Sequence, residues 1–404
     1  MLNRRDLIKR LTALPLLGGV AGTFAFTRAA ALSPQRDYFK ELGVRTFINA
    51  AGTYTAMTGS LMHEEVLAAI QYASKEFVLL DELQDRVGER LASLLQCEAA
   101  MVTSGAASAI TLATAGVLTG LDDKKAAALP RLEGTGMKTE VIMQKSHAIA
   151  YDHALKNTGV TVIQVETRAE LEKAISDKTA LMFFVNFCNP DGKVQAEEFV
   201  QIGKRYKIPT LNDCAADVPP VENLWKYTKM GFDAVCFSGG KGIHGPQSAG
   251  LLLGRKDIVA AARLNAPPRG NTIGRGMKVN KEEVLGMLAA IELYLTRNHE
   301  QDWKLWESQI AHIHSAVQSI PGVTAKIDVP AIANHVPTLN VSWDVKKIKV
   351  SGDELKDILR KGHPSIEVAG GGANSISITT WVLVPGQERI VASRVREVLM
   401  KASA

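Results

Sequence analysis

The segment FDAVCFSGGKGIHGPQSAG, residues 232–250, joins an apolar run to a glycine-rich loop that carries one lysine, Lys241. The run from Phe232 to Phe237 is apolar except at Asp233, as expected for a buried strand. A nucleotide phosphate loop needs GxxxxGK followed by Ser or Thr, but Lys241 is followed by Gly242. The spacing therefore excludes that loop. It favours a lysine amine that attacks an aldehyde and forms a Schiff base, with small neighbours that leave room for the bound group.

Strand-like and helical segments alternate upstream of this loop. The apolar runs are AAMVTS (99–104), VIMQ (141–144), TVIQVE (161–166), TALMFFVN (179–186) and IPTLND (208–213). Helical periodicity occupies residues 77–96, 108–120, 167–176 and 197–206. This alternation predicts an α/β fold in which helices flank a mostly parallel sheet.

The pattern changes after a long helical stretch at residues 281–319. Short strands at residues 325–329, 338–344, 365–369 and 375–384 surround a helix at 351–362, and a helix at 388–403 closes the chain. We therefore predict an N-terminal arm at 32–62, a large domain at 63–300 and a small α+β domain at 301–404.

The composition is that of a globular protein whose default partner is not nucleic acid. The 404 residues are 46% hydrophobic and 22% charged, and the formal net charge of +5 is spread among acidic residues rather than gathered in a stripe. Cys97, Cys188, Cys214 and Cys236 lack metal-ligand spacing, so no metal site is expected and buried free thiols are favoured.

The first 31 residues are typical of an export signal. Arg4 and Arg5 precede an uncharged segment, Leu11–Thr27, and then Ala29–Ala31. This pattern resembles the twin-arginine type of signal, which engages the export machinery for folded proteins. The apolar run is shorter than the ~20 residues that a spanning helix needs, so no stable membrane anchor is expected after cleavage. We therefore predict cleavage after about Ala31 and a mature protein that is periplasmic or secreted.

A Schiff-base lysine suggests pyridoxal 5′-phosphate, and the sequence offers partners for each part of that cofactor. Asp213 ends the run IPTLND and would keep the ring nitrogen protonated, although alone it would be read as a helix cap. TSGAAS (103–108) lies between a strand and a helix, where Ser104, Gly105 and Ala106 would hold a phosphate dianion; alone it is an ordinary helix start. Further candidates are the hydroxyl of Ser238 for the phosphate and His147 for the ring face.

These motifs together resemble the fold type I pyridoxal phosphate enzymes of the selenocysteine synthase and D-glucosaminate-6-phosphate ammonia-lyase group. FINAAGT (47–53), QKSHAIAYDHA (144–154), NDCAADVPP (212–220) and the lysine loop followed by GPQ occur in the family's order over most of the chain. The resemblance implies that Lys241 binds the cofactor covalently, that Asp213 pairs with its ring nitrogen and that His147 stacks on its ring. It assigns the phosphate to Ser104, Gly105, Ala106 and Ser238.

The motifs do not assign a residue to the substrate carboxylate. Many fold type I enzymes bind the substrate carboxylate with an arginine of the small domain, but residues 361–388 contain none, and Ala369–Gly372 carry no binding side chain. The resemblance makes Arg269, Arg275 and Lys278 the candidates for an anionic group; for Arg275 and Lys278 the alternative is a solvated basic loop.

The expected activity is α,β-elimination from an amino acid or amino sugar acid. Aminotransferase, other transferase and racemase reactions use the same groups and stay open, because the pocket selects the outcome. A periplasmic protein that binds the cofactor or an amine without turnover is a further alternative. The resemblance also implies a homodimer or larger homo-oligomer. A tRNA substrate is not expected, because the export signal takes the place of the selenocysteine synthases' N-terminal tRNA-binding region.

Overall fold

The computed structural model describes residues 36–403, so the predicted export signal lies outside the described residues. The chain separates into two compact units between Thr46 and Phe47. In the described part of the first unit, helix α2 (Tyr38–Glu41) begins at Asp37, whose carboxylate accepts a hydrogen bond from the Lys40 backbone N–H at 3.0 Å. The second unit contains all of the remaining elements.

A seven-stranded sheet forms the centre of the larger fold within residues 36–403, in the order β2-β8-β7-β6-β5-β3-β4. Its strands are β2 (Ala99–Thr103), β3 (Glu140–Gln144), β4 (Thr161–Val165), β5 (Thr179–Val185), β6 (Thr210–Asp213), β7 (Ala234–Ser238) and β8 (Gly250–Gly254). Strands β4, β3, β5, β6 and β7 run parallel, and β8 is antiparallel to both of its neighbours. The predicted mostly parallel α/β fold is confirmed.

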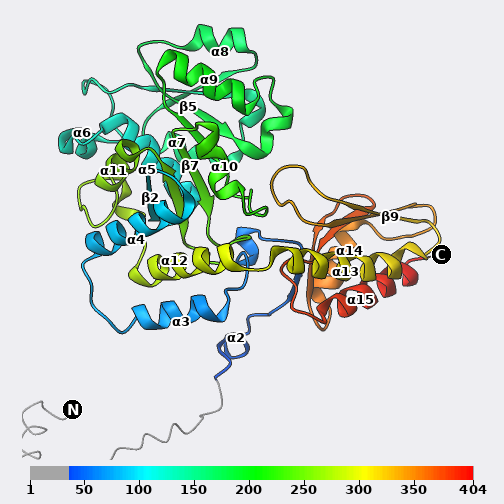
Figure 1. Ribbon diagram of the computed structural model, residues 1–404. Helices are drawn as coiled ribbons and strands as arrows, with labels where there is room; N and C mark the ends of the chain where they lie inside the picture. The colour runs from blue at the N-terminus through cyan, green and yellow to red at the C-terminus, as the bar shows by residue number, and fades with distance from the viewer. Residues whose placement is uncertain (1–35, 404) are drawn as a thin grey trace, which may run out of the picture. The chain divides into compact units, whose positions relative to one another are not determined.

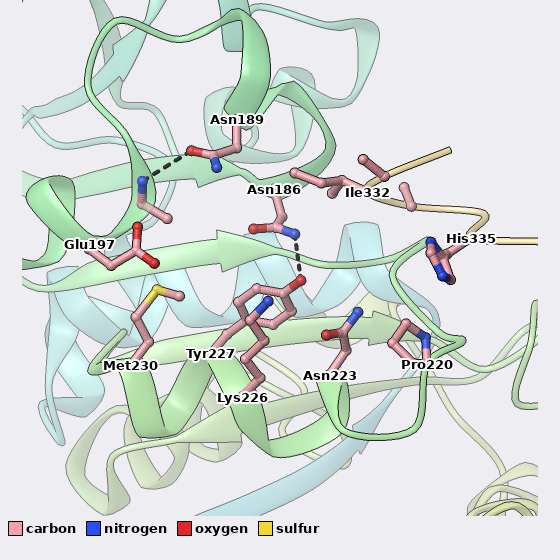
Figure 2. Close-up of a pocket in the computed structure, with 13 residues that line it drawn as sticks. Asn186, Asn189, Glu197, Pro220, Asn223, Lys226, Tyr227, Met230, Ile332 and His335 are labelled. Carbon is pink, nitrogen blue, oxygen red and sulfur yellow. Dashed lines mark hydrogen bonds between the residues drawn. The ribbon is translucent and has the colours of Figure 1, made fainter. Parts of the chain in front are cut away.

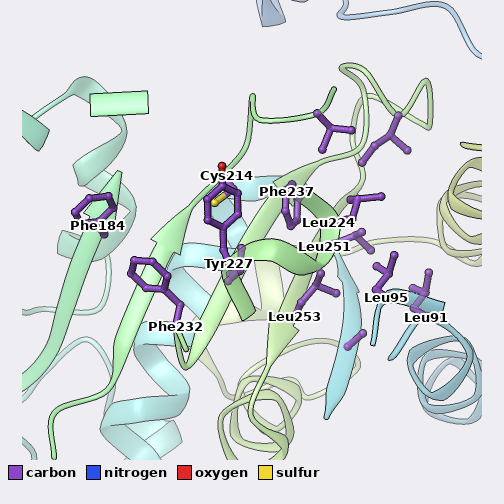
Figure 3. Close-up of a cluster of buried hydrophobic side chains, with 14 of the residues drawn as sticks. Leu91, Leu95, Phe184, Cys214, Leu224, Tyr227, Phe232, Phe237, Leu251 and Leu253 are labelled. Carbon is purple, nitrogen blue, oxygen red and sulfur yellow. The ribbon is translucent and has the colours of Figure 1, made fainter. Parts of the chain in front are cut away.

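Helices cover both faces of this sheet because successive strand residues point to opposite faces. One face packs against α3 (Glu64–Ala73), α4 (Leu80–Leu95), α8 (Arg168–Ala174), α9 (Ala196–Tyr206), α10 (Asn223–Met230) and α12 (Lys281–Thr296). The other packs against α5 (Ala106–Thr119), α6 (Asp123–Ala128), α7 (His153–Lys156) and α11 (Lys256–Leu264). Phe184 and Phe183, adjacent in β5, enter different cores, and Figure 3 shows Phe184 with Phe232 and Phe237 in the first.

A second sheet of five strands, in the order β1-β11-β12-β10-β9, occupies the C-terminal part of the described chain (Figure 1). Its strands are β1 (Ile48–Ala50), β9 (Val323–Asp328), β10 (Thr338–Trp343), β11 (Ile366–Gly370) and β12 (Ser375–Thr379). Helices α13 (His299–Gln318), α14 (Gly352–Lys361) and α15 (Gln387–Lys401) bury its apolar side chains. Strand β1 pairs in parallel with β11, so a segment assigned to the N-terminal arm completes this sheet.

The helical stretch at residues 281–319 is two helices rather than one. Helix α12 ends at Thr296 and α13 begins at His299, where the side chain of Asn298 caps the new helix by accepting from the Gln301 N–H at 3.0 Å. Asparagine is a strong helix start residue, which explains the break. Among the described residues, we find no helix with the length and apolarity required to cross a membrane.

Candidate active site

Lys241 lies in the tight turn that follows β7, at the carboxyl edge of the large sheet. The Ser60 hydroxyl donates to the Lys241 carbonyl oxygen at 2.8 Å, and the Ser60 N–H donates to the Gly240 carbonyl at 2.9 Å. A Cβ at Gly242 would collide with the carbonyl oxygen of Val218, so the residue after the lysine must be glycine. These contacts fix the backbone of the lysine. Its half-buried Nζ has no hydrogen bond or ion pair with the described residues.

Asp213 is the last residue of β6, the strand beside β7. Its side chain is 7% exposed, and its hydrogen bonds go to one oxygen: Oδ1 accepts from the Ala215 N–H at 3.0 Å and faces the Cys236 thiol at 3.7 Å. Oδ2 therefore keeps its capacity to accept a further hydrogen bond. Carboxyl ends of parallel strands are where such folds bind their ligands.

Burial governs the electrostatics of both groups. It raises the pKa of Asp213 and lowers the pKa of Lys241, while the attraction between their opposite charges partly counteracts each shift. A lowered pKa increases the fraction of Lys241 that is an unprotonated amine, which is the form that attacks a carbonyl carbon. The pair therefore combines a nucleophilic amine with a carboxylate that benefits from a cationic partner.

The candidate phosphate residues come together because of the register of β8. Gly250 pairs with Thr103 of β2 on one side and with Ser238 of β7 on the other. A Cβ at Gly250 would lie 2.5 Å from the Gly105 carbonyl carbon, so only glycine lets the turn before α5 approach so closely. This places the start of α5 and Ser238 on either side of one strand.

The start of α5 has the features of an anion site. Gly105 adopts the left-handed φ of 89° and precedes the first turn of the helix, whose backbone N–H groups have no partner within the helix. The Ser104 and Ser108 hydroxyls lie 2.8 Å apart, and the Ser238 hydroxyl has no hydrogen-bond partner among the described residues. The spare oxygen of Asp213, the free amine of Lys241 and this cradle fit the ring nitrogen, the aldehyde and the phosphate of pyridoxal phosphate.

The side chain of His147 is held by neighbouring protein groups. Its side chain is fully buried in the 3-10 helix η2 (Lys145–His147) that follows β3. Its Nδ1 accepts from the Val185 N–H at 3.0 Å, and its edge packs on Phe184 with ring centroids 4.4 Å apart. Burial lowers its pKa to about 4. A ring without accessible surface presents no face to a cofactor, so these contacts support a structural role, and stacking stays a prediction.

Of the three predicted anion-binding residues, Arg269 forms an ion pair, whereas Arg275 and Lys278 are exposed. Arg269 donates to Asp81 at 2.5 Å, and Asp81 also accepts from Arg263 at 2.7 Å. Arg275 and Lys278 are exposed in a loop whose Gly274 packs tightly against Leu112 of α5. Neither has an ion-pair partner in the described chain, and both stay candidates for an anionic group.

A second buried carboxyl, missed in the sequence, lies beside the first. Asp217 is 1% exposed, and burial raises its pKa to about 7. Its Oδ1 accepts from Asn186 Nδ2 at 3.1 Å, and its backbone carbonyl accepts from Asn223 Nδ2 at 2.6 Å. Asn186 Nδ2 also donates to the Tyr227 hydroxyl at 2.7 Å. In the sequence, only the second aspartate of NDCAADVPP, which is Asp217, could have pointed to this cluster.

The fold and the site together define a pyridoxal-phosphate-dependent enzyme of fold type I. Residues 80–361 match the aminotransferase class-V family, and the chain belongs to that family. Its cofactor is therefore pyridoxal 5′-phosphate, and the protein is a lyase or transferase that depends on this cofactor.

Several characterised proteins are similar over most of the chain. D-glucosaminate-6-phosphate ammonia lyase of Salmonella typhimurium is 28% identical over 91% of this chain and 99% of its own length. The L-seryl-tRNA(Sec) selenium transferase of Caldanaerobacter subterraneus is 25% identical over 77% of this chain and 71% of its own. A solved structure of D-glucosaminate-6-phosphate ammonia-lyase has a TM-score of 0.78 with 27% identity, covering 91% of this chain and 99% of that one.

Proposed function

We propose that the enzyme catalyses α,β-elimination from an amino acid or amino sugar acid, releasing ammonia and a keto acid. The observation that carries the proposal is the free amine of Lys241 beside the buried carboxyl of Asp213, at the ends of two adjacent parallel strands. Similarity to an ammonia lyase over 91% of the chain supports elimination over the other reactions of the class.

The residues divide the chemistry between them. Bound pyridoxal phosphate supplies an aldehyde for the substrate amine and a ring that takes up the electron pair of the α-carbon. Asp213 would hold a proton at the ring nitrogen, and Ser104, Gly105, Ala106 and Ser238 would hold the phosphate. Lys241, once its amine is free, would remove the α-proton, for which its lowered pKa suits it.

The remaining steps follow from proton and electron balance. The electron pair left at the α-carbon expels a leaving group from the β-carbon, and the resulting enamine takes up water to give a keto acid and ammonia. Arg275 and Lys278 would bind an anionic group of the substrate. No external oxidant or second amine acceptor is needed, which distinguishes elimination from transamination.

Ammonia release tests this proposal. The purified holoenzyme is incubated with a panel of hydroxylated amino acids and amino sugar acids in the absence of any keto acid. We expect ammonia and a keto acid in equal amounts. Product that forms only after a keto acid is added would identify an aminotransferase instead, and inversion at the α-carbon without ammonia would identify a racemase.

We further propose export through the twin-arginine route, which delivers folded and cofactor-loaded protein to the periplasm. Arg4, Arg5 and the uncharged segment that follows support it. Changing both Arg4 and Arg5 to Lys should retain holoprotein inside the cell, detected by fractionation. Unchanged secretion of the double variant would argue against this route.

We also propose a homodimer. Large apolar side chains before, on and after α3 are strongly exposed: Leu61 (70%), Tyr72 (66%), Phe77 (104%) and Leu79 (74%). Exposed apolar groups of this density are typical of subunit interfaces. Light scattering should give twice the mass of the chain, and Phe77→Asp should shift the protein toward monomer. A monomeric parent protein would contradict the proposal.

A further inference from the structure

A cavity separate from the Lys241 turn opens at the end of β5, where the structure brings four segments together (Figure 2). Asn186 and Asn189 come from the segment after β5, Glu197 from the start of α9, and Asn223, Lys226 and Tyr227 from α10. Residues 331–335 close the fourth side and are held there by the Asn334 N–H, which donates to the Ala216 carbonyl at 2.8 Å. The cavity volume is about 150 Å³.

The buried wall of the cavity presents a hydrogen-bond acceptor without a partner. Asn186 is 3% exposed, and its Nδ2 is engaged by Asp217 and Tyr227. With Asn186 Nδ2 directed at Asp217 Oδ1 and at the Tyr227 hydroxyl, Asn186 Oδ1 points away from both groups. Figure 2 shows this oxygen pointing into the cavity, and no described residue donates to it. This oxygen can therefore accept a hydrogen bond from a molecule in the cavity.

The other polar groups of the cavity are hydrogen-bond acceptors and a carboxylate on one side and a lysine at the rim. Asn223 is 9% exposed, its Nδ2 is bonded to the Asp217 carbonyl, and its Oδ1 has no donor among the described residues. Glu197 adds a carboxylate, so this side of the cavity accepts hydrogen bonds and favours a cation. Lys226, at the exposed rim, supplies the opposite charge. Met230 and Ile332 add apolar side chains to the lining.

We propose that this cavity binds a small zwitterionic amino acid, with the ammonium group against Asn186 and Glu197 and the carboxylate toward Lys226. An ammonium has three donors for the amide oxygens and the carboxylate. A cavity of about 150 Å³ accommodates roughly six heavy atoms, the size of alanine. Lys241 does not line the cavity, so the bound molecule is an effector rather than the substrate.

Calorimetric titration of the holoenzyme tests the proposal. Borohydride reduction first fixes the cofactor on its lysine, so that no amine can react there. We expect saturable binding of L-alanine, with ethylamine and propionate, which each carry one of its two charges, at least ten-fold weaker. Because turnover is not required, this result is independent of whether the enzyme is a lyase.

Two pairs of variants locate the binding. Lys226→Met and Glu197→Gln should each weaken alanine binding about three- to ten-fold, since each removes one charge contact. Lys229→Met on the same helix and Glu198→Gln beside Glu197 lie outside the cavity lining and should have no effect. The proposal is overturned if reduced holoenzyme does not bind alanine, if the control variants weaken binding equally, or if the single-charge compounds bind as tightly as alanine.

Discussion

The buried carboxyl groups of the two sheets differ in their partners. At the carboxyl edge of the large sheet, Asp213 and Lys241 attract each other without forming a hydrogen bond, and Asp217 is buried among amides. In the small sheet, the buried Glu367 is bound through both oxygens by Arg360, at 2.7 and 2.9 Å. A closed ion pair stabilises a geometry but has no capacity left for a ligand. The difference indicates that the chemistry belongs to the large sheet.

The strongest test of this comparison is Asp213→Asn. The amide keeps the shape of the side chain but cannot stabilise a protonated ring nitrogen. We expect turnover to fall by about 10²–10⁴-fold, with cofactor still bound through the lysine. Steady-state kinetics and the cofactor's visible absorbance measure both parts. A variant with unchanged turnover would remove Asp213 from the catalytic group.

Asp217→Asn tests the second buried carboxyl through its pH dependence. The pKa of Asp217 is raised to about 7 in the folded protein, against about 4 when unfolded. The stability it contributes is therefore complete below about pH 4 and lost as the pH rises through 7. Relative to the parent, the variant should gain about 4 kcal/mol in free energy of unfolding between pH 4 and 8.

Urea denaturation of both proteins at several pH values measures that gain. The comparison of parent with variant cancels the opposite effect of other groups, such as His147, whose lowered pKa removes stability as the pH falls from 6.5 toward 4. A stability difference that does not change with pH would show that the pKa of Asp217 is not raised in the folded protein.

Gly250→Ala tests the phosphate cradle. The added Cβ would lie 2.5 Å from the Gly105 carbonyl carbon, which must move and take the start of α5 with it. Overpacking of this kind costs about 1–3 kcal/mol, and we expect cofactor affinity to fall about ten-fold. Gly270→Ala is the matched control, because no atom lies within 4 Å of its added Cβ. Equal cofactor affinity in the two variants would contradict the account.

The smallest effect is expected in the small sheet. Lys326 and Asp328 form an ion pair at 2.5 Å on exposed side chains of β9. Exposed pairs contribute little to stability, so Lys326→Ala should change neither the melting temperature nor cofactor affinity measurably. A loss of cofactor in this variant would show that the small sheet takes part in binding it.

Local sequence patterns predicted the helices and strands. The features that they did not predict depend on packing between residues far apart in the sequence. The alternation of apolar and helical segments predicted β2 to β7, because these strands, apart from the edge strand β4, are mostly buried. It could not predict that Ile48–Ala50 pairs with β11 more than three hundred residues away. The roles of Gly250 and Asn186 depend likewise on strand register and neighbouring elements. The orientation of the His147 ring, set by Val185 and Phe184, has no signature in sequence.

The most direct test of the central claim is the visible absorbance of the purified protein and of Lys241→Ala. The account predicts that the parent protein shows the band of lysine-bound pyridoxal phosphate, and that the variant lacks this band and loses turnover although it folds normally. Lys229→Ala, which changes a lysine of helix α10 outside the turn, should leave the band unchanged. A Lys241→Ala protein that keeps the band after dialysis would contradict the assignment of Lys241 as the lysine that binds the cofactor.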